Sequence, residues 1–359
     1  MENKEKNILW VDIAKFSGIF LVIISHVIGN LGLLKTGIFE YINTFCNLFY
    51  MPLFFVVAGF LYKDKGLKNN YNKIIWALII PYLIYQFAFL PFVLGNNVLF
   101  HNLPIINTLK KCLIGILLGD VEEYASLFIG VCCPCWFIMS MIQLRILFAH
   151  IKMDLQTLLL FATAAIIITK LLVIFHIDLY FCLDNTLMAI PYFIFGYLLK
   201  NYFCINIEKI DLHLRMLSIM LSILILCLIL RINSFIIYAR VTTNIQNNQS
   251  LLLIFLAGII GSLMVIFFST LFIKANDFVI TIAKNTLFII YFHFQLLFFV
   301  KWIGLETILH CSRNTQLINL LLVLFLTIMN LIINYYLIKF LERHCPLILG
   351  KGLKNGLSK

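Results

Sequence analysis

The sequence predicts an all-α, polytopic integral membrane protein: a helical bundle of about ten transmembrane helices with both termini in the cytoplasm. Three observations lead to this fold class. Hydrophobic residues make up 62% of the chain, charged residues only 12%, and the mean hydropathy is +1.01, whereas soluble domains are about 45–50% apolar and about 25% charged. Apolar runs long enough to cross about 30 Å of hydrocarbon recur along the whole chain. Lysine and arginine are concentrated in alternate loops, as cytoplasmic loops require.

Apolar stretches separated by loop signals give ten predicted spans. The sixth of them is short, which suggests that it is tilted or broken. Residues 103–118 are too short to cross comfortably and carry Lys110 and Lys111 in their middle, so this stretch is expected to be an interfacial or re-entrant helix. The ten spans lie near residues 8–30, 44–62, 74–95, 126–148, 156–175, 187–200, 213–237, 251–273, 279–302 and 316–340.

The basic residues set the expected orientation. With the N-terminus inside, 18 of the 27 Lys and Arg residues fall on the cytoplasmic side and 8 on the other, and Lys15 lies within the first span. We therefore expect a multi-pass protein of the inner (plasma) membrane, with a membrane domain at 1–345 and a short basic cytoplasmic tail at 346–359. The formal charge of +11 then reflects loops and lipid headgroups, and no basic-plus-aromatic module indicates nucleic-acid binding.

The first span carries three ionisable residues, Asp12, Lys15 and His26. Such groups cost several kcal/mol in hydrocarbon unless they are paired or hydrated, so they indicate function. Lys15 and His26 are eleven residues apart, about 20° past three whole turns, so they share a face and lie roughly 16 Å apart along the axis. Asp12 can pair with Lys15 but cannot reach His26, whose partner must come from another span. The alternative is an interfacial anchor, with Lys15 reaching the headgroups and His26 bonding to a neighbouring helix.

The motif Asp12-Ile-Ala-Lys15, followed by Ser25-His26 at Lys-x10-His spacing, resembles the opening of the acyltransferase-3 family of membrane acyltransferases, in particular its fucose 4-O-acetylase-like branch. Two positions depart from the family pattern: Ala58 stands where Ser is common, and Phe16 where Gly is common. Further segments resemble family signatures in the same order: FYMPLFFVVAGFL (49–61), CWF (135–137) followed by Gln143 and Arg145, AIPYFIFGYL (189–198), KNTLFIIYFH (284–293) and PLILGK (346–351).

The resemblance implies an O-acetyltransferase that moves an acetyl (acyl) group from acetyl-CoA to a hydroxyl of a cell-envelope polysaccharide or lipid-linked sugar. His26 matches the family's essential histidine, which would act as a general base or as a covalent acyl carrier. Lys15 matches the basic partner and would hold a phosphate of coenzyme A or the thioester oxygen. Asp12 is assigned to substrate binding beside it. Acetyl-CoA enters as a donor substrate, so no cofactor and no metal is expected.

Four residues outside the first span are further candidates for substrate binding. Arg145 would contact CoA phosphates or serve only as a positive-inside anchor. His293 lies about 15 residues into the ninth span, at the expected depth of His26, with Asn285 lining the same cavity; the alternative is a histidine satisfied within the bundle. Trp136 would pack in an aromatic belt or stack on the acceptor sugar.

Two other functions remain open from the sequence, a polysaccharide exporter or permease and an assembly subunit of a glycan synthase. Transporters also bury ionisable groups, often in inverted repeats, but the two five-span halves of this chain share no motif, and its buried polar residues are expected mainly on the first and ninth spans. A metal site lacks support, because the cluster Cys132, Cys133 and Cys135 has no second ligand pair at suitable spacing.

Overall fold

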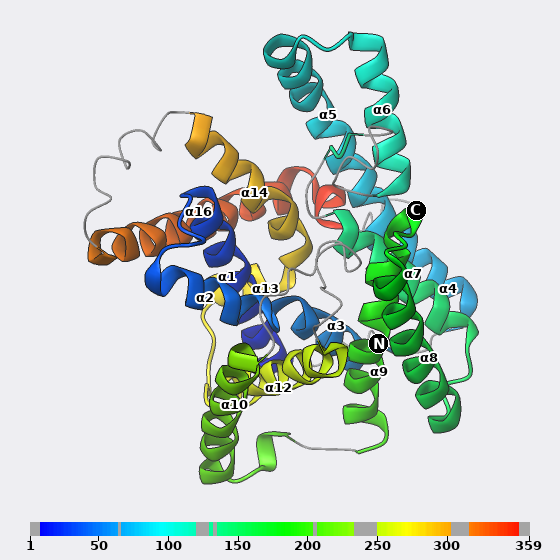
Figure 1. The fold of residues 1–359 in the computed structure, drawn as a ribbon, viewed down its shortest axis with the longest axis vertical. Coiled ribbons are helices and arrows are strands. Elements are labelled where there is room, and N and C mark those ends of the chain that lie inside the picture. Colours follow the sequence, from blue (N-terminus) through cyan, green and yellow to red (C-terminus); the bar gives the residue numbers. More distant parts are fainter. Residues whose placement is uncertain are drawn as a thin grey trace. The chain divides into compact units, whose positions relative to one another are not determined.

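The helices account for all the regular structure in the part of the chain that a computed structural model describes (Figure 1), and no strand occurs there. The all-α prediction is therefore confirmed. The described residues are 8–63, 66–119, 129–131, 135–203, 207–232, 250–302 and 316–351. They form two compact units, each of which is described by itself.

Unit 1 comprises Met1–Tyr62, Tyr192–Tyr238 and Asn248–Ile338. Its α1 packs against α2, α3, α12, α13 and α14, and α10 lies beside α12 (Figure 1). The elements are α1 (Leu9–Asn30), α2 (Gly37–Asn47), α3 (Tyr50–Phe60), α9 (Leu183–Asn201) from Tyr192 on, η3 (Ile207–Lys209), α10 (Leu212–Ile232), α12 (Leu251–Ser269), α13 (Asp277–Lys284), α14 (Thr286–Trp302) and α16 (Gln316–His344) up to Ile338.

Unit 2 contains the described residues between Lys63 and Pro191 and those from Lys339 onward. Asp154 caps α8 by accepting hydrogen bonds from the backbone N–H (2.9 Å) and hydroxyl (3.0 Å) of Thr157, which hold the pKa of the Asp154 carboxyl below its ordinary value. The elements are α4 (Leu67–Ile74), the π-helical turn η1 (Ile75–Ile79), α5 (Ile80–His101), α6 (Ile105–Leu118), α7 (Cys135–His150), α8 (Leu155–Phe175), η2 (Tyr180–Cys182), the start of α9 and η4 (Pro346–Leu349).

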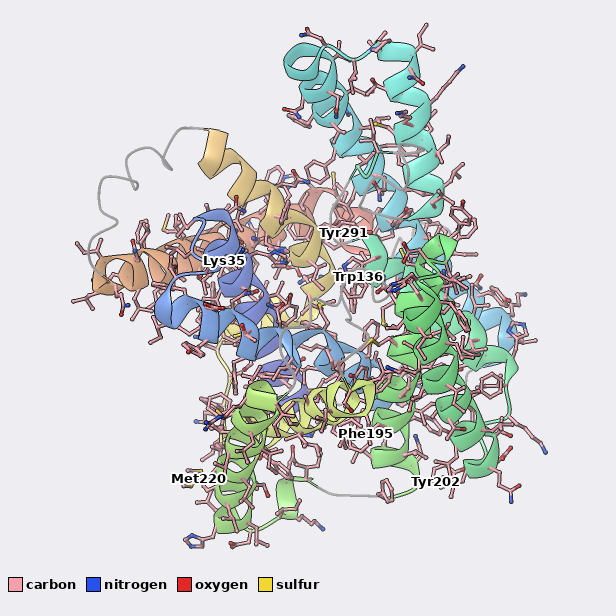
Figure 2. The ribbon with its side chains drawn as sticks, viewed as in Figure 1. Lys35, Trp136, Phe195, Tyr202, Met220 and Tyr291 are labelled. Atoms are coloured by element: carbon pink, nitrogen blue, oxygen red, sulfur yellow. The ribbon has the colours of Figure 1, made fainter. Side chains whose placement is uncertain are left out.

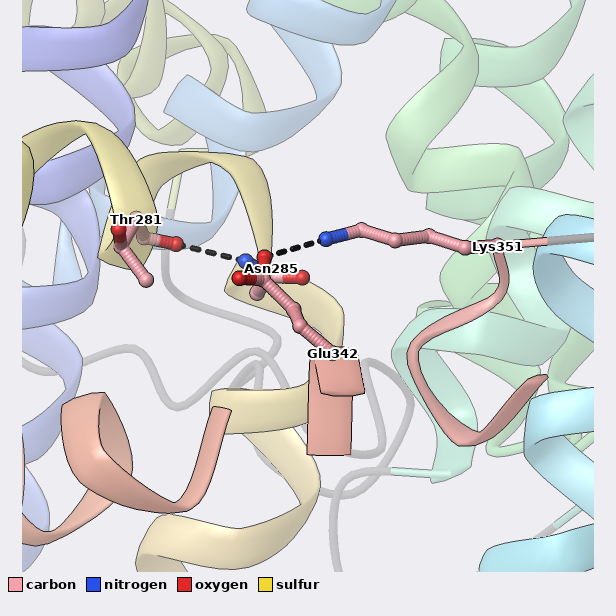
Figure 3. Close-up of polar contacts among 4 residues, drawn as sticks. All are labelled: Thr281, Asn285, Glu342 and Lys351. Carbon is pink, nitrogen blue, oxygen red and sulfur yellow. Dashed lines mark hydrogen bonds and ion pairs between the residues drawn. The ribbon is translucent and has the colours of Figure 1, made fainter. Parts of the chain in front are cut away.

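The residues after α16 fold onto unit 2. The Tyr85 hydroxyl of α5 donates a hydrogen bond to the Ile348 carbonyl (2.6 Å), and Lys351 forms an ion pair of 2.6 Å with Glu342 (Figure 3). The closing PLILGK segment is thus a packed turn against α5.

Eight helices of the described chain are long and apolar enough to cross a membrane, and a ninth span results if the bent pair α13–α14 counts as one. The segment Gly37–Phe60 is 89% buried within the protein and α1 is 67% buried, whereas α10 is only 17% buried. Met220 illustrates the outward face of α10 (Figure 2). Large exposed apolar faces are typical of contact with lipid, so α1 to α3 form the interior of unit 1.

Three predicted spans, the fourth, sixth and ninth, differ from the structure. In place of the fourth, predicted at 126–148, the described residues contain α7, a helix of 16 residues that is shorter than the candidate spans. The sixth is not short, because the helical run begins at Tyr180 and continues to Asn201 over 22 residues. The ninth is not one continuous helix, because it breaks at Asn285 with a bend of 91° between α13 and α14. The predicted loop at 63–73 also contains α4, which runs through η1 into α5.

A pair of glycines sets the approach of α3 to α9. A Cβ added at Gly59 would overlap the Phe193 carbonyl of α9, and one added at Gly196 would overlap the Val56 carbonyl of α3. Small residues at helix crossings allow backbones to approach closely in membranes. Two motifs around Gly59 and Gly196, which are 137 residues apart in the sequence, are therefore the two sides of one helix contact.

We expect Gly196→Ala to destabilise the protein, because the added methyl group forces α9 away from α3. Overpacking of this kind costs about 1–3 kcal/mol, so the unfolding temperature of the purified protein in detergent should fall. Gly95→Ala is the control, since no heavy atom lies within 4 Å of a Cβ built there. Equal unfolding temperatures for the two variants would contradict the role assigned to this contact.

Candidate active site

Two histidines meet in the interior of unit 1. His26 lies in the last two turns of α1 and is partly buried, and its ring centroid is 5.1 Å from that of His293 on α14, with 46° between the ring planes. Phe294 lies edge-on to His26 at 5.5 Å. The structure thus places a histidine of another span against the His26 ring.

The hydrogen bonding of His293 fixes which ring nitrogen can act as a base. Its side chain is 1% exposed, and Nδ1 lies 2.8 Å from the Ile289 carbonyl, a position in which Nδ1–H donates. A neutral imidazole that donates from Nδ1 carries its lone pair on Nε2. This Nε2 is buried and has no hydrogen-bond partner among the described residues. The site therefore holds an imidazole nitrogen whose lone pair accepts no hydrogen bond from the part of the chain that the structure describes.

A stripe of polar side chains on α16 supports α14 at this point. The side-chain amide of Asn330 donates to the His293 carbonyl (3.0 Å), and that of Asn334 donates to the Asn330 carbonyl and to its Oδ1 (both 2.9 Å). Thr327, Asn330 and Asn334 are all at most 3% exposed and stand at helical spacing. The expectation that buried polar residues lie mainly on the first and ninth spans was therefore wrong, because α16 and several other helices also carry buried polar side chains.

A cluster of charges surrounds the first turn of α1. Asp12 is 7% exposed, and both Lys15 and Lys284 are near enough to act electrostatically on its carboxylate. Lys15 is partly buried and Lys284, the last residue of α13, is exposed. One carboxylate between two ammonium groups leaves an excess positive charge at the Lys15 end of the α1 face that carries Lys15 and His26. Pairing of Asp12 with Lys15 was expected, and Lys284 adds a cation from another helix.

Asn285 forms the junction between α13 and α14. Its backbone N–H bonds to the Ile282 carbonyl and its own carbonyl accepts from Ile289 N–H (both 3.2 Å), so it ends one helix and begins the next. Its side-chain amide donates to the Thr281 carbonyl at 2.8 Å (Figure 3), while its Oδ1 is buried without a partner among the described residues. Broken helices at membrane depth occur where they line a cavity or a binding site.

The two remaining candidates, Trp136 and Arg145, belong to unit 2. Trp136 lies in the first turn of α7 with its ring 6.1 Å from that of Phe137 (Figure 2). Arg145 is partly buried, nine residues farther along the same helix. Cys132 and Cys133 lie outside the described residues, and no group of three or more potential metal ligands occurs within them.

Sequence reasoning missed Asn330, Asn334 and Lys284. The asparagines carry a recognisable signal, because Thr327, Asn330 and Asn334 repeat at i, i+3 and i+7 in an otherwise apolar span and so share a helix face. Lys284 has no such signal, since its approach to Asp12 depends on how α13 crosses α1.

Residues 8–339 match the family model described as an acyltransferase domain. The chain belongs to the acyltransferase-3 family. The match runs from α1 into the last turns of α16, so it includes both histidines, the charge cluster and the asparagine stripe. In comparisons with curated proteins and with solved structures, nothing matches. The protein is therefore a multi-pass membrane acyltransferase, and its place in the fucose 4-O-acetylase-like branch stays a prediction.

We expect Asn330→Ala to destabilise this acyltransferase, because it removes the donor to the His293 carbonyl and an acceptor of Asn334. Leaving a buried polar group without its partner costs about 1–3 kcal/mol. The measurement is the unfolding temperature in detergent, with Ile328→Ala on the exposed side of the same helix as the control. An unfolding temperature no lower than that of the control would show that the stripe does not stabilise α14.

Proposed function

We propose that the protein is an O-acyltransferase of the inner (plasma) membrane that transfers an acetyl group from acetyl-CoA to a hydroxyl of a cell-envelope polysaccharide or lipid-linked sugar. The observation that carries this proposal is the His26–His293 pair, with ring centroids 5.1 Å apart and with the Nε2 atom of His293 buried and lacking a hydrogen-bond partner among the described residues. A buried imidazole with a free basic nitrogen is suited to take a proton from a hydroxyl.

The transfer can follow either of two balanced routes. In the direct route, a histidine nitrogen takes the hydroxyl proton while the oxygen attacks the thioester carbonyl; the C–S bond breaks and the proton passes to the departing thiolate. In the covalent route, the thioester first acylates His26 with loss of the thiol, and the hydroxyl then attacks the acyl-imidazole. Both routes start from an unprotonated ring, and His293 is placed to serve as the second proton carrier.

The charge cluster of Asp12, Lys15 and Lys284, at the end of α1 away from His26, is suited to bind the donor acetyl-CoA. The basic loops predict that the first turn of α1 lies at the cytoplasmic face, where acetyl-CoA is present. Lys15 would bind a phosphate of the donor, and Asp12 would hold the Lys15 ammonium in place. In unit 2, Arg145 is proposed as a further phosphate contact and Trp136 as a stacking surface for the acceptor sugar.

A polysaccharide exporter or permease is the second candidate, because the helix break at Asn285 and the buried polar groups around it are also features of transporter binding sites. Radiolabel transfer from acetyl-CoA to a glycan by the purified protein separates the two functions. Transport without acyl transfer would favour the permease. Capture of a glycosyltransferase by a protein without either activity would favour an assembly subunit.

Replacing His26 by Ala should abolish acetylation of the acceptor while membrane insertion is retained, because the ring that touches His293 and would handle the proton or acyl group is lost. General acid–base groups contribute about 10²–10⁴-fold to rate. The measurement is the acetate content of the envelope glycan, with His213→Ala as the control since His213 is exposed at the start of α10. Normal acetate in the His26 variant would rule out the proposal.

Lys15→Gln should raise the KM for acetyl-CoA about tenfold, the effect of losing about 1.4 kcal/mol of charge-assisted binding, and should change kcat much less. Steady-state kinetics at several acetyl-CoA concentrations measure both constants. The control is Lys35→Gln, which removes an exposed lysine of the loop after α1 (Figure 2). A fall in kcat with an unchanged KM would place Lys15 in the chemical step instead.

A further inference from the structure

Contacts within unit 1 define two levels along α1. At the level of the chemistry, the His26 ring lies against the His293 ring of α14, and Asn330 of α16 donates to the His293 carbonyl. The helices α1, α14 and α16 therefore meet at this level.

The other level lies one residue beyond Lys15. The Phe16 ring is 6.1 Å from that of Phe278 on α13, and Phe278 is 5.2 Å from Tyr335 on α16, whose hydroxyl donates to Asp277 (2.9 Å). The helices α1 and α16 therefore both contact the broken pair α13–α14 at each of the two levels. Phe16 therefore forms part of this packing.

Three buried hydrogen-bond acceptors along this stretch have no partner among the described residues: Asn285 Oδ1 at the helix break, Asn334 Oδ1 one residue before Tyr335, and His293 Nε2 at the chemical level. We call these three residues the polar strip. Asn285 is 4% exposed, His293 1% and Asn334 0%. Buried polar atoms in proteins are nearly always hydrogen-bonded, and an unmet acceptor costs free energy. All three atoms call for a ligand that brings N–H or O–H donors.

The distance along α1 decides what kind of ligand fits. The cations near Asp12 and the histidine pair are separated by the eleven-residue interval from Lys15 to His26, roughly 16 Å of helix. A donor that places phosphates at one end and a thioester at the other needs a long, thin connection between them. In acyl-CoA that connection is the pantetheine arm, and it carries two amide N–H groups and a hydroxyl.

We propose that the polar strip receives the pantetheine arm of the acyl-CoA donor, with the arm's amide N–H groups donating to Asn285 Oδ1 and Asn334 Oδ1. In this arrangement Lys284 joins Lys15 in binding the phosphates, and the thioester reaches His26 and His293. The inference rests on the proposed function, since it takes an acyl-CoA as the donor. It assigns Asn285 and Asn334 to binding of the arm and Lys284 to binding of the phosphates.

Three donors test the assignment on the full-length protein in detergent or vesicles. Acetyl-CoA carries phosphates and amides, acetyl-pantetheine carries the amides alone, and an S-acetyl alkanethiol of similar length carries neither. Asn285→Leu and Asn334→Leu should raise KM about tenfold for the first two donors, the loss expected for one hydrogen bond to a buried acceptor, and leave the alkanethiol unaffected. Lys284→Gln should raise KM for acetyl-CoA only.

Asn47→Leu is the matched control. Asn47 is 5% exposed on α2, and its amide donates to the Asn43 carbonyl four residues back (2.8 Å), the same local bond that Asn285 makes to Thr281. This variant should lose comparable stability and keep the KM of every donor. If a leucine variant fails to fold, the serine variants at Asn285 and Asn334 are compared in the same way, together with the rise in unfolding temperature caused by acetyl-pantetheine.

The outcomes separate this inference from the proposed function. Equal KM increases for all three donors, or none for the two that carry amides, would overturn the assignment of the polar strip while acyl transfer itself stands. Absence of transfer from every donor by the wild-type protein would overturn the proposed function, and the inference with it.

Discussion

Hydrocarbon offers no water to a buried polar group, so each such group in this protein must find its partner inside the bundle. Most do: Asp12 lies near two lysines, Asn330 bonds to the His293 carbonyl, and Asn334 bonds to Asn330. In unit 1 the acceptors left over within the described residues include His293 Nε2 and the Oδ1 atoms of Asn285 and Asn334. They occur on the same helices, α14 and α16, and on the junction that begins α14. Under the proposed function, these acceptors are the groups that a bound substrate would satisfy.

Close helix packing gives this arrangement a firm frame. Gly59 and Gly196 let α3 and α9 touch through their backbones, and Gly258 and Gly261 of α12 leave room for the rings of Tyr192 and Phe49. Tightly packed interiors transmit strain and resist displacement. A frame of this kind can hold two imidazoles at a fixed separation, which a catalytic pair requires.

Helix geometry alone was enough to predict most of the spans and the shared face of Lys15 and His26, because apolar run lengths and a period of 3.6 residues depend only on local sequence. The expected common depth of His26 and His293 followed from counting residues along two spans. The break at Asn285 was not predicted, since the segment around it has no Gly or Pro and the polar residues Lys284, Asn285 and Thr286 interrupt the apolar run only briefly. The contact of Asn330 with α14 and the approach of Lys284 to Asp12 depend on which helix faces meet, and tertiary packing decides that.

The break at Asn285 also has a consequence for how the site is built. A straight ninth span would carry Lys284 and His293 on one rigid rod, with a fixed angle and rise between them. The 91° bend separates their directions, so α13 can cross the first turn of α1 with its cation while α14 runs along the last turns of α1 with its histidine. Asn285 sustains the bend by ending one helix and beginning the next with its own backbone. The Oδ1 atom of Asn285 takes part in the hydrogen bonds of neither helix among the described residues. In the proposed arrangement it can therefore accept a hydrogen bond from a molecule bound between the charge cluster and the histidine pair.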